Sequence, residues 1–400
     1  MPDLPTLPQD PIVDEIRAAV ERLGLARRYH ELDRQPEFPR AEFRAMGDAR
    51  LLGLRTPVKF GGRGLPLPRV GIALFHLAYL AGTTFAKLSL QPEFSSVLCE
   101  HGSDELIDAW FRPMVRGERV IGNQITEPGA GSDAGAIAMT ADPAGEHYLL
   151  SGEKSEAAFA AEAEAAIVYA RVRGRDPRKE ITAFLVPQDL AGITRQVSAG
   201  DLGERWQRRG SIRYDRVELP RRFRIGNEGE GFDYVRSELT REHALLAAIY
   251  LGVARASWEE TVRYVESRSA FGRPLSAQEA VAFPLVEDGA VLEATWLYAE
   301  RVLERLERGE DVHAEAALSK WMATEAALEA IDHAIQFHGG RGYSQEFPHE
   351  QRWRDVRSGR IGHGPSEIML QVAARKLWPR RGDRGARPAP GKAPESGGPV

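Results

Sequence analysis

Apolar residues recur at helical spacing through the first part of the chain. Ile16, Val20 and Leu23 follow one another at intervals of four and three residues, and residues 90–115 continue in the same style. The turn-rich segment 60–66 interrupts this pattern, because glycine and proline punctuate regular structure. The pattern therefore predicts a helical N-terminal domain that ends near Arg119.

The apolar pattern changes after Gly117. Short runs with β-branched or aromatic content, separated by Gly, Pro and Asp, are typical of strands and occupy residues 148–151, 165–172, 181–186 and 212–219. No long helical pattern lies between these runs. The region therefore predicts a small antiparallel β-barrel or β-sandwich.

Helical spacing returns from Phe232 to about Trp378 in long segments such as 242–268 and 312–337. The last twenty residues hold five Gly and four Pro and have little to bury, which predicts disorder. We therefore expect a mostly α fold of the α+β class. Its predicted parts are an N-terminal helical domain at 1–119, a β-domain at 120–226, a C-terminal helical bundle at 227–380 and a tail at 381–400.

Composition narrows the class of protein. The formal charge is −5, so no bulk electrostatic argument supports binding to nucleic acid or to an anionic membrane. The nearly apolar run 70–82 is too short to span a bilayer, and no secretory signal is visible at the N-terminus. The one cysteine, Cys99, excludes an internal disulfide, and the histidines show no metal-ligand spacing. We expect a cytoplasmic enzyme without a bound metal.

The segment Thr126–Asp133 joins the helical region to the β region and reads Thr-Glu-Pro-Gly-Ala-Gly-Ser-Asp. Its glycines resemble a dinucleotide fingerprint, but the last spacing is one residue too long and no βαβ unit surrounds it. Thr and Ser hydroxyls with exposed Gly amides suit a flat heteroaromatic ligand rich in hydrogen-bond acceptors. An ordinary interdomain turn is the alternative interpretation.

Other glycine-rich segments fall at the ends of predicted helices. Residues 226–232 form a hinge before a helix, and Arg268 to Pro274 close a long helix. The guanidinium of Arg268 suits a pyrophosphate, although an arginine in the last turn of a helix is also favourable by itself. Phe271 could cover a ring. Glycines in the segment Gln336–Tyr343 permit close backbone approach of a ligand or a partner chain.

Together and in this order, these segments resemble the acyl-CoA dehydrogenase family over residues 15–380. The residues that carry the resemblance are Thr126–Asp133, Gly152-Glu-Lys154, Gly226–Phe232, Arg268–Pro274, Gln336–Tyr343, and Arg354-Asp355 leading to Gly364. The resemblance implies an N-terminal helical domain, a β-domain and a C-terminal four-helix bundle. It also implies FAD between the β-domain and the bundle, in a homotetramer built as a dimer of dimers.

The resemblance implies roles for residues that match the family's motifs. Ile125 and Thr126 meet the flavin ring by backbone and hydroxyl, and Ser132 lies near the thioester. His243 occupies a position usually held by Arg, which helps to order the thioester end, and Gly364 contributes to substrate binding. The residues implied to reach the FAD of a neighbouring subunit are Arg268, Phe271, Gln336, Gly339 and Gly340.

The chain departs from the family around the flavin. Glu156 stands where a bulky apolar residue, often Trp, flanks the flavin, and Ala158 stands where a hydroxyl is expected. Glu279 replaces the usual Gln, and Pro365 replaces a Thr. His363 occupies the position of the catalytic carboxylate of many relatives. The commonest catalytic base of the family is therefore missing.

A carboxylate is available elsewhere. In some branches of the family the base lies early in the first long C-terminal helix, ten residues before a glycine, and Glu242 lies ten residues before Gly252. A solvated glutamate near a helix N-terminus is the alternative interpretation of Glu242. Three possibilities stay open: Glu242 is the base, His363 is the base, or the chain has no base.

The resemblance implies an FAD-dependent acyl-CoA dehydrogenase that desaturates an acyl-CoA thioester and passes electrons to an electron-transferring flavoprotein. The base removes the α-hydrogen as a proton while the β-hydrogen passes to the flavin as hydride. The departures support a second interpretation, a diverged relative without dehydrogenase activity, either a lyase or a scaffold. A flavin oxidase or monooxygenase on the same fold is a third.

Overall fold

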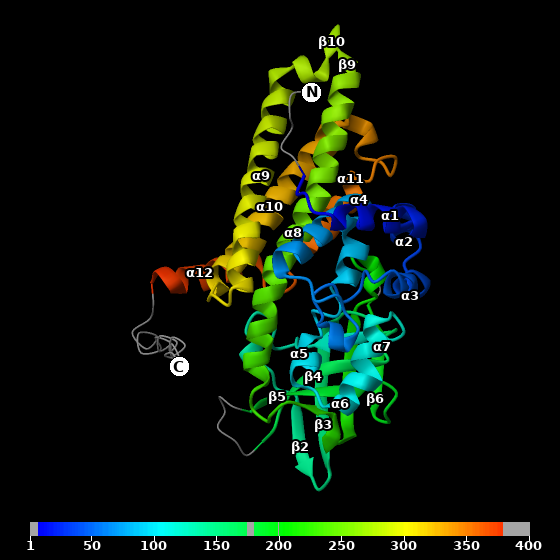
Figure 1. Ribbon diagram of the computed structural model, residues 1–400, viewed down its shortest axis with the longest axis vertical. Helices are drawn as coiled ribbons and strands as arrows, with labels where there is room; N and C mark the ends of the chain where they lie inside the picture. Colours follow the sequence, from blue (N-terminus) through cyan, green and yellow to red (C-terminus); the bar gives the residue numbers. More distant parts are fainter. Residues whose placement is uncertain (1–6, 174–179, 199, 379–400) are drawn as a thin grey trace, which may run out of the picture.

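The computed structural model describes residues 7–173, 180–198 and 200–378. A helical bundle forms one end of the elongated molecule and a β-domain forms the other, and the N-terminal helices pack beside both (Figure 1). The helices of the N-terminal region are α1 (Ile12–Leu23), α2 (Leu25–Arg34), α3 (Arg40–Asp48), α4 (Leu67–Ser89), α5 (Ser96–His101), α6 (Asp104–Leu106) and α7 (Arg112–Val115). The predicted disordered tail, 381–400, lies outside the described residues.

Helix α4 is the apolar centre of the N-terminal region. Its 23 residues are long and apolar enough to cross a membrane by length and composition, but 89% of that window is buried inside the protein. The helix packs along α8 (Gly231–Ser267), and Gly252 lies at the crossing, where a Cβ would come within 2.2 Å of the Phe75 carbonyl oxygen. Gly82 interrupts α4 with a φ of +73°, and a Cβ at this position would lie 2.5 Å from the Tyr29 ring.

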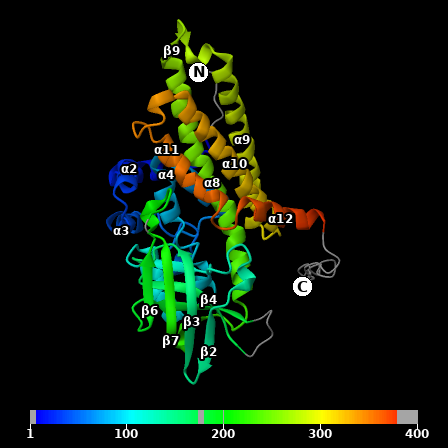
Figure 2. The ribbon, with the colours of Figure 1, turned by 180° about the vertical axis from the view of Figure 1, so that it is seen from behind.

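The β-domain is one eight-stranded sheet within the described residues. Its strands are β1 (Ile121–Gln124), β2 (Thr140–Ala144), β3 (His147–Ala157), β4 (Ala165–Arg171), β5 (Ile181–Pro187), β6 (Ile193–Val197), β7 (Gly210–Pro220) and β8 (Arg224–Ile225), in the spatial order β6-β7-β3-β2-β4-β5-β8, with β1 on β4. Figure 2 shows β6, β7 and β3 side by side. Every residue of β5 and all but the last of β4 are buried, as for strands that are covered on both faces.

Two features of the sheet differ from the predicted antiparallel strands. β1 runs parallel to β4, and β2 meets β4 in parallel at Thr140. The β2–β3 hairpin lies between β1 and β4 in the sequence, so the chain returns to β4 in its original direction. β3 also continues past the predicted end at Ser151, because a bulge at Gly152 breaks the apolar alternation without ending the strand.

Three long helices dominate the C-terminal region: α8, α9 (Glu279–Glu307) and α10 (His313–Phe337). The shorter α11 (His349–Arg357) and α12 (Ser366–Leu377) pack against α10. The 37 residues of α8 extend over about 55 Å, so this helix reaches from the β-domain to the far end of the bundle (Figure 1). A small ribbon of β9 (Ser269–Ala270) and β10 (Arg273–Pro274) lies at that far end.

Candidate active site

The fold brings together the two residues that the sequence offered as alternative bases. Glu242 lies in the first third of α8 and is 3% exposed, which rules out a solvated glutamate. His363 lies in the turn between Arg360 and α12. Its Nδ1 is 2.9 Å from Oε2 of Glu242. A buried carboxyl and an imidazole therefore form one hydrogen-bonded pair.

Two buried side chains, Lys320 and His243, hold the backbone around His363 in place. Nζ of Lys320, on α10, donates hydrogen bonds to the carbonyl oxygens of Gly362 and Gly364 at 2.6 and 2.5 Å. Nε2 of His243 is 2.7 Å from the carbonyl oxygen of His363. The two hydrogen bonds from Lys320, here called the Lys320 clamp, therefore hold the backbone at Gly362 and Gly364, and His243 holds it at His363.

The His363 ring also stacks on Phe94, with ring centroids 5.1 Å apart. Asn123 on β1 donates from Nδ2 to the Phe94 carbonyl oxygen at 3.0 Å. Segments from the N-terminal helices, the β-domain and the bundle therefore meet at the pair. The sequence motifs do not point to Phe94 or Lys320, because neither residue belongs to a glycine-rich segment.

Burial governs the protonation of the pair. Burial raises the pKa of Glu242 to about 8, although the neighbouring Arg241 guanidinium opposes this shift. Partial desolvation of the His363 ring, whose side chain is 35% exposed, and the ammonium groups of Lys320 and Lys87 lower its pKa. The imidazole is therefore neutral at physiological pH, and the carboxyl is a proton acceptor of unusually high affinity.

The segment Thr126–Asp133 is anchored at one end and open at the other. The buried Nζ of Lys154 on β3 donates to the Ile125 carbonyl oxygen at 2.9 Å and to Glu127 at 2.8 Å. The Thr126 carbonyl oxygen accepts from the Ser155 N–H at 2.9 Å. Beyond this anchor, Ser132 is exposed and a Cβ at Gly129 or Gly131 would meet nothing within 4 Å. A flat ligand can therefore approach the rim of the loop closely.

The other residues matched to cofactor binding lie far from this loop. Phe271 is 97% exposed beside β9, at the end of the bundle remote from the β-domain (Figure 1). Tyr264 stacks on His338 with centroids 4.1 Å apart, which places the end of α10 at the same end of the molecule. The exposed residues of this group are Arg268, Phe271, Gln336, Gly339 and Gly340. Within one chain, the two halves of the expected cofactor site therefore lie far apart.

The departures near the flavin position are visible in the structure. The Glu156 side chain is 63% exposed and pairs with Nη1 of Arg209 at 3.1 Å. Ala158 is half-buried, and the next residue, Phe159, is buried near Phe38 and Trp206. An exposed carboxylate therefore stands where the family has an apolar ring. The loop and the exposed far-end residues fit FAD, whereas residues 156 and 158 supply neither the ring nor the hydroxyl.

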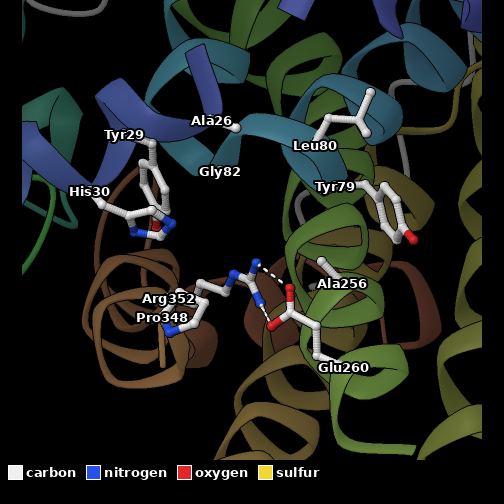
Figure 3. Close-up of a pocket in the computed structure, with 10 residues that line it drawn as sticks. All are labelled: Ala26, Tyr29, His30, Tyr79, Leu80, Gly82, Ala256, Glu260, Pro348 and Arg352. Atoms are coloured by element: carbon white, nitrogen blue, oxygen red, sulfur yellow. Dashed lines mark hydrogen bonds and ion pairs between the residues drawn. The ribbon is translucent and has the colours of Figure 1, made fainter. Parts of the chain in front are cut away.

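A cavity of about 260 Å³ lies elsewhere, between α2, α4, α8 and α11 (Figure 3). Both terminal nitrogens of Arg352 donate to the Glu260 carboxylate, at 2.8 and 3.0 Å, on one side of this cavity. None of the residues matched to the family's site lines it. The cavity is thus separate from the Glu242–His363 pair.

Comparison with known proteins decides the family. Residues 8–118, 122–217 and 229–378 match the N-terminal, middle and C-terminal domains of acyl-CoA dehydrogenase. The chain belongs to the acyl-CoA dehydrogenase family. It is 32% identical over 348 residues to the mitochondrial short-chain specific acyl-CoA dehydrogenase of Bos taurus, which covers 87% of this chain and 84% of the relative.

Further matches include a relative that is named as a reductase and two solved structures. The 3-(aryl)acrylate reductase of Clostridium sporogenes is 30% identical, over 87% of this chain and 92% of its own. The crystal structure of an acyl-CoA dehydrogenase from Geobacillus kaustophilus superposes with a TM-score of 0.86 at 26% identity, covering 92% of this chain and 98% of the other. A further neighbour, the FAD complex of PigA, has a TM-score of 0.86 at 24% identity and shows the same fold.

These comparisons confirm the predicted family and the predicted fold of a helical domain, a β-domain and a helical bundle. The predicted enzyme class and the predicted cofactor, FAD, are confirmed at the level of the family. The roles of individual residues rest on the geometry described above.

Proposed function

We propose that this protein is an FAD-dependent acyl-CoA dehydrogenase that introduces an α,β double bond into an acyl-CoA thioester, with Glu242 as its base. The observation that carries the proposal is the buried carboxyl of Glu242, held by His363 where the three domains meet. Family membership supplies the reaction class, and the pair supplies the acid–base group that the usual catalytic position lacks.

Bound FAD supplies the hydride acceptor of the reaction. The protein's part is to take up the α-proton of the thioester and to exclude water from the carboxyl that receives it. A base works best when its pKa lies near the operating pH, and burial gives Glu242 this property. Because His363 is neutral, it brings no positive charge that would pair with the Glu242 carboxylate and lower its affinity for the α-proton.

The segment Ile125–Ser132 would hold the flavin end of FAD. Arg268 and the residues around Gly339 would bind the adenosine and pyrophosphate end of FAD in a second copy, because they lie at the remote end of their own chain. We therefore propose a homo-oligomer, a dimer or a tetramer, as the functional unit. An electron-transferring flavoprotein is the proposed electron acceptor, and the cytoplasm is the proposed location.

A test is the anaerobic reduction of the flavin by acyl-CoA thioesters. Protein loaded with FAD should bleach on addition of a matched thioester and form the corresponding enoyl-CoA in equal amount. The test should use a panel of straight-chain, branched and aryl-substituted thioesters, because the relatives include a short-chain specific acyl-CoA dehydrogenase and a 3-(aryl)acrylate reductase. Bound flavin that no thioester bleaches would contradict the proposal and favour a lyase, a scaffold or a flavin oxidase.

A further inference from the structure

Glu242 and its neighbour Glu238, one turn earlier on α8, are held in different ways. The Glu238 carboxylate accepts hydrogen bonds from the Val97 N–H, the Ser96 hydroxyl and the Tyr169 hydroxyl, at 2.9, 3.2 and 3.1 Å. The hydrogen bond that the structure shows for Glu242 joins one oxygen, Oε2, to His363. Glu238 is therefore fixed in place as part of the core, whereas Oε1 of Glu242 is free to meet a substrate.

The turn that carries His363 is arranged to hold its ring against Glu242. His363 has a φ of +52°, a left-handed conformation that is unfavourable for a residue other than glycine. The Lys320 clamp on the two flanking carbonyls and the His243 contact to the His363 carbonyl stabilise this conformation. Phe94 fixes the plane of the ring by stacking. An unfavourable backbone conformation that several contacts maintain points to a functional role for the side chain.

We propose that His363 is a positioning residue for the proposed base: its Nδ1–H donates to Oε2 of Glu242, leaves Oε1 to accept the α-proton, and favours the ionised carboxylate. The proposal rests on the proposed function. A hydrogen bond donated to the charged form of an acid stabilises that form, so His363 opposes the effect of burial on Glu242. Without this hydrogen bond the carboxyl would keep its proton to a higher pH, so a smaller fraction of it could act as a base at a given pH.

The surroundings of His363 keep its ring in the neutral form that this role requires. Desolvation of the ring, with the positive charges of Lys320 and Lys87, disfavours a second proton on it, so the imidazole stays neutral while the carboxylate gains and loses its proton. The titratable and charged groups that interact with Glu242 or His363 are Glu238, Arg241 and His243 on α8, Lys320 on α10, Lys87 on α4, Glu93, Tyr169 on β4, and Glu204.

Two substitutions at position 363 separate the donor from the backbone. His363→Gly removes the ring without strain, because glycine accepts a positive φ. His363→Asn also tolerates this conformation, and its Nδ2–H lies close to the place of Nδ1–H. His147→Ala, at the tip of the β2–β3 hairpin, is the matched control.

The experiment measures the titration of Glu242 in FAD-loaded protein. Infrared difference spectroscopy follows the C=O stretch of its protonated carboxyl, which the Glu242→Gln variant identifies by its loss. The pH dependence of flavin reduction in a single turnover gives a second readout. His363→Gly should raise both midpoints by about one pH unit or more, and His363→Asn should restore most of the shift. At a pH well above the new midpoint, His363→Gly should recover part of the flavin reduction rate that it loses near neutral pH.

A midpoint that stays in place or falls in His363→Gly would overturn the proposal, since Glu242 would then donate to the ring instead of accepting from it. An equal loss of rate at every pH would also overturn it, because a purely structural role produces that pattern. The infrared titration needs no turnover. Failure of the proposed function, seen as flavin that no thioester reduces, is therefore distinct from failure of this inference.

Discussion

Oε2 of Glu242 and Nδ1 of His363 lie 2.9 Å apart, although the two residues are 121 positions apart in the sequence. The family resemblance implies that these two positions are alternative sites for the catalytic carboxylate, and in this chain a glutamate stands at one of them and a histidine at the other. The sequence left open whether Glu242, His363 or neither residue is the base. In the proposed account the two residues divide the work: the Glu242 carboxyl accepts the proton, and the His363 imidazole holds that carboxyl in place.

Glu242 should make the stability of the protein depend on pH. Its pKa is raised by burial from 4.5 to about 8, so the folded state binds a proton that the unfolded state has lost between these values. The free energy of unfolding should therefore fall as pH rises through this window, by at most about 1.4 kcal/mol per pH unit for this group. Glu242→Gln removes the effect.

The difference in melting temperature between Glu242→Gln and the wild type should thus grow in favour of the variant as pH rises towards 8. Thermal unfolding at constant FAD concentration measures it. Glu21→Gln, at an exposed position on α1, is the control and should show no such trend. A constant difference between Glu242→Gln and the wild type across the window would contradict the account.

The crossing of α4 and α8 depends on Gly252. A Cβ at this position would lie 2.2 Å from the Phe75 carbonyl oxygen and 3.1 Å from Cβ of Ala78. Gly252→Ala must push the two helices apart and should lower the free energy of unfolding by about 1–3 kcal/mol or more. Chemical denaturation measures the loss. Gly200→Ala adds a methyl where nothing lies within 4 Å, and should change stability by no more than about 0.5 kcal/mol.

Arg268 directly precedes β9, at the end of the bundle remote from the β-domain, and should still matter for cofactor retention. Arg268→Ala should weaken FAD binding by about tenfold or more, because a charge-assisted contact to the pyrophosphate of a neighbour is lost. Fluorescence of released FAD measures the affinity, and sedimentation measures the oligomeric state. A fully active monomer, or unchanged FAD affinity in Arg268→Ala, would sink the shared-site account.

Local pattern was enough to predict much of the fold. The helices around Val20 and the strand at Ala165 follow from apolar spacing, because each element buries a face of regular period. The parallel pairing of β1 with β4 could not be predicted in this way. Spacing along one segment carries no information on the direction in which a distant strand returns.

The candidate site was predictable only in part. Through the family resemblance, the ten-residue interval from Glu242 to Gly252 indicated the carboxyl, and His363 was placed at the position of the usual catalytic carboxylate. The hydrogen bond between the two residues is a product of tertiary packing. Lys320 supports the loop from α10, and a lysine is expected at the surface of a helix, whereas the fold leaves this one only 1% exposed.

The central claim is that Glu242 accepts the α-proton, and single-turnover reduction of the bound flavin by a matched acyl-CoA tests it most directly. Glu242→Gln keeps the size of the side chain and its hydrogen bonding but cannot accept the proton. The account predicts a fall in the reduction rate by roughly 10²–10⁴-fold with acyl-CoA binding largely retained, while His363→Gly recovers at high pH. Reduction of Glu242→Gln at close to the wild-type rate, with His363→Gly inactive at every pH, would contradict the account and place the base on the loop at His363.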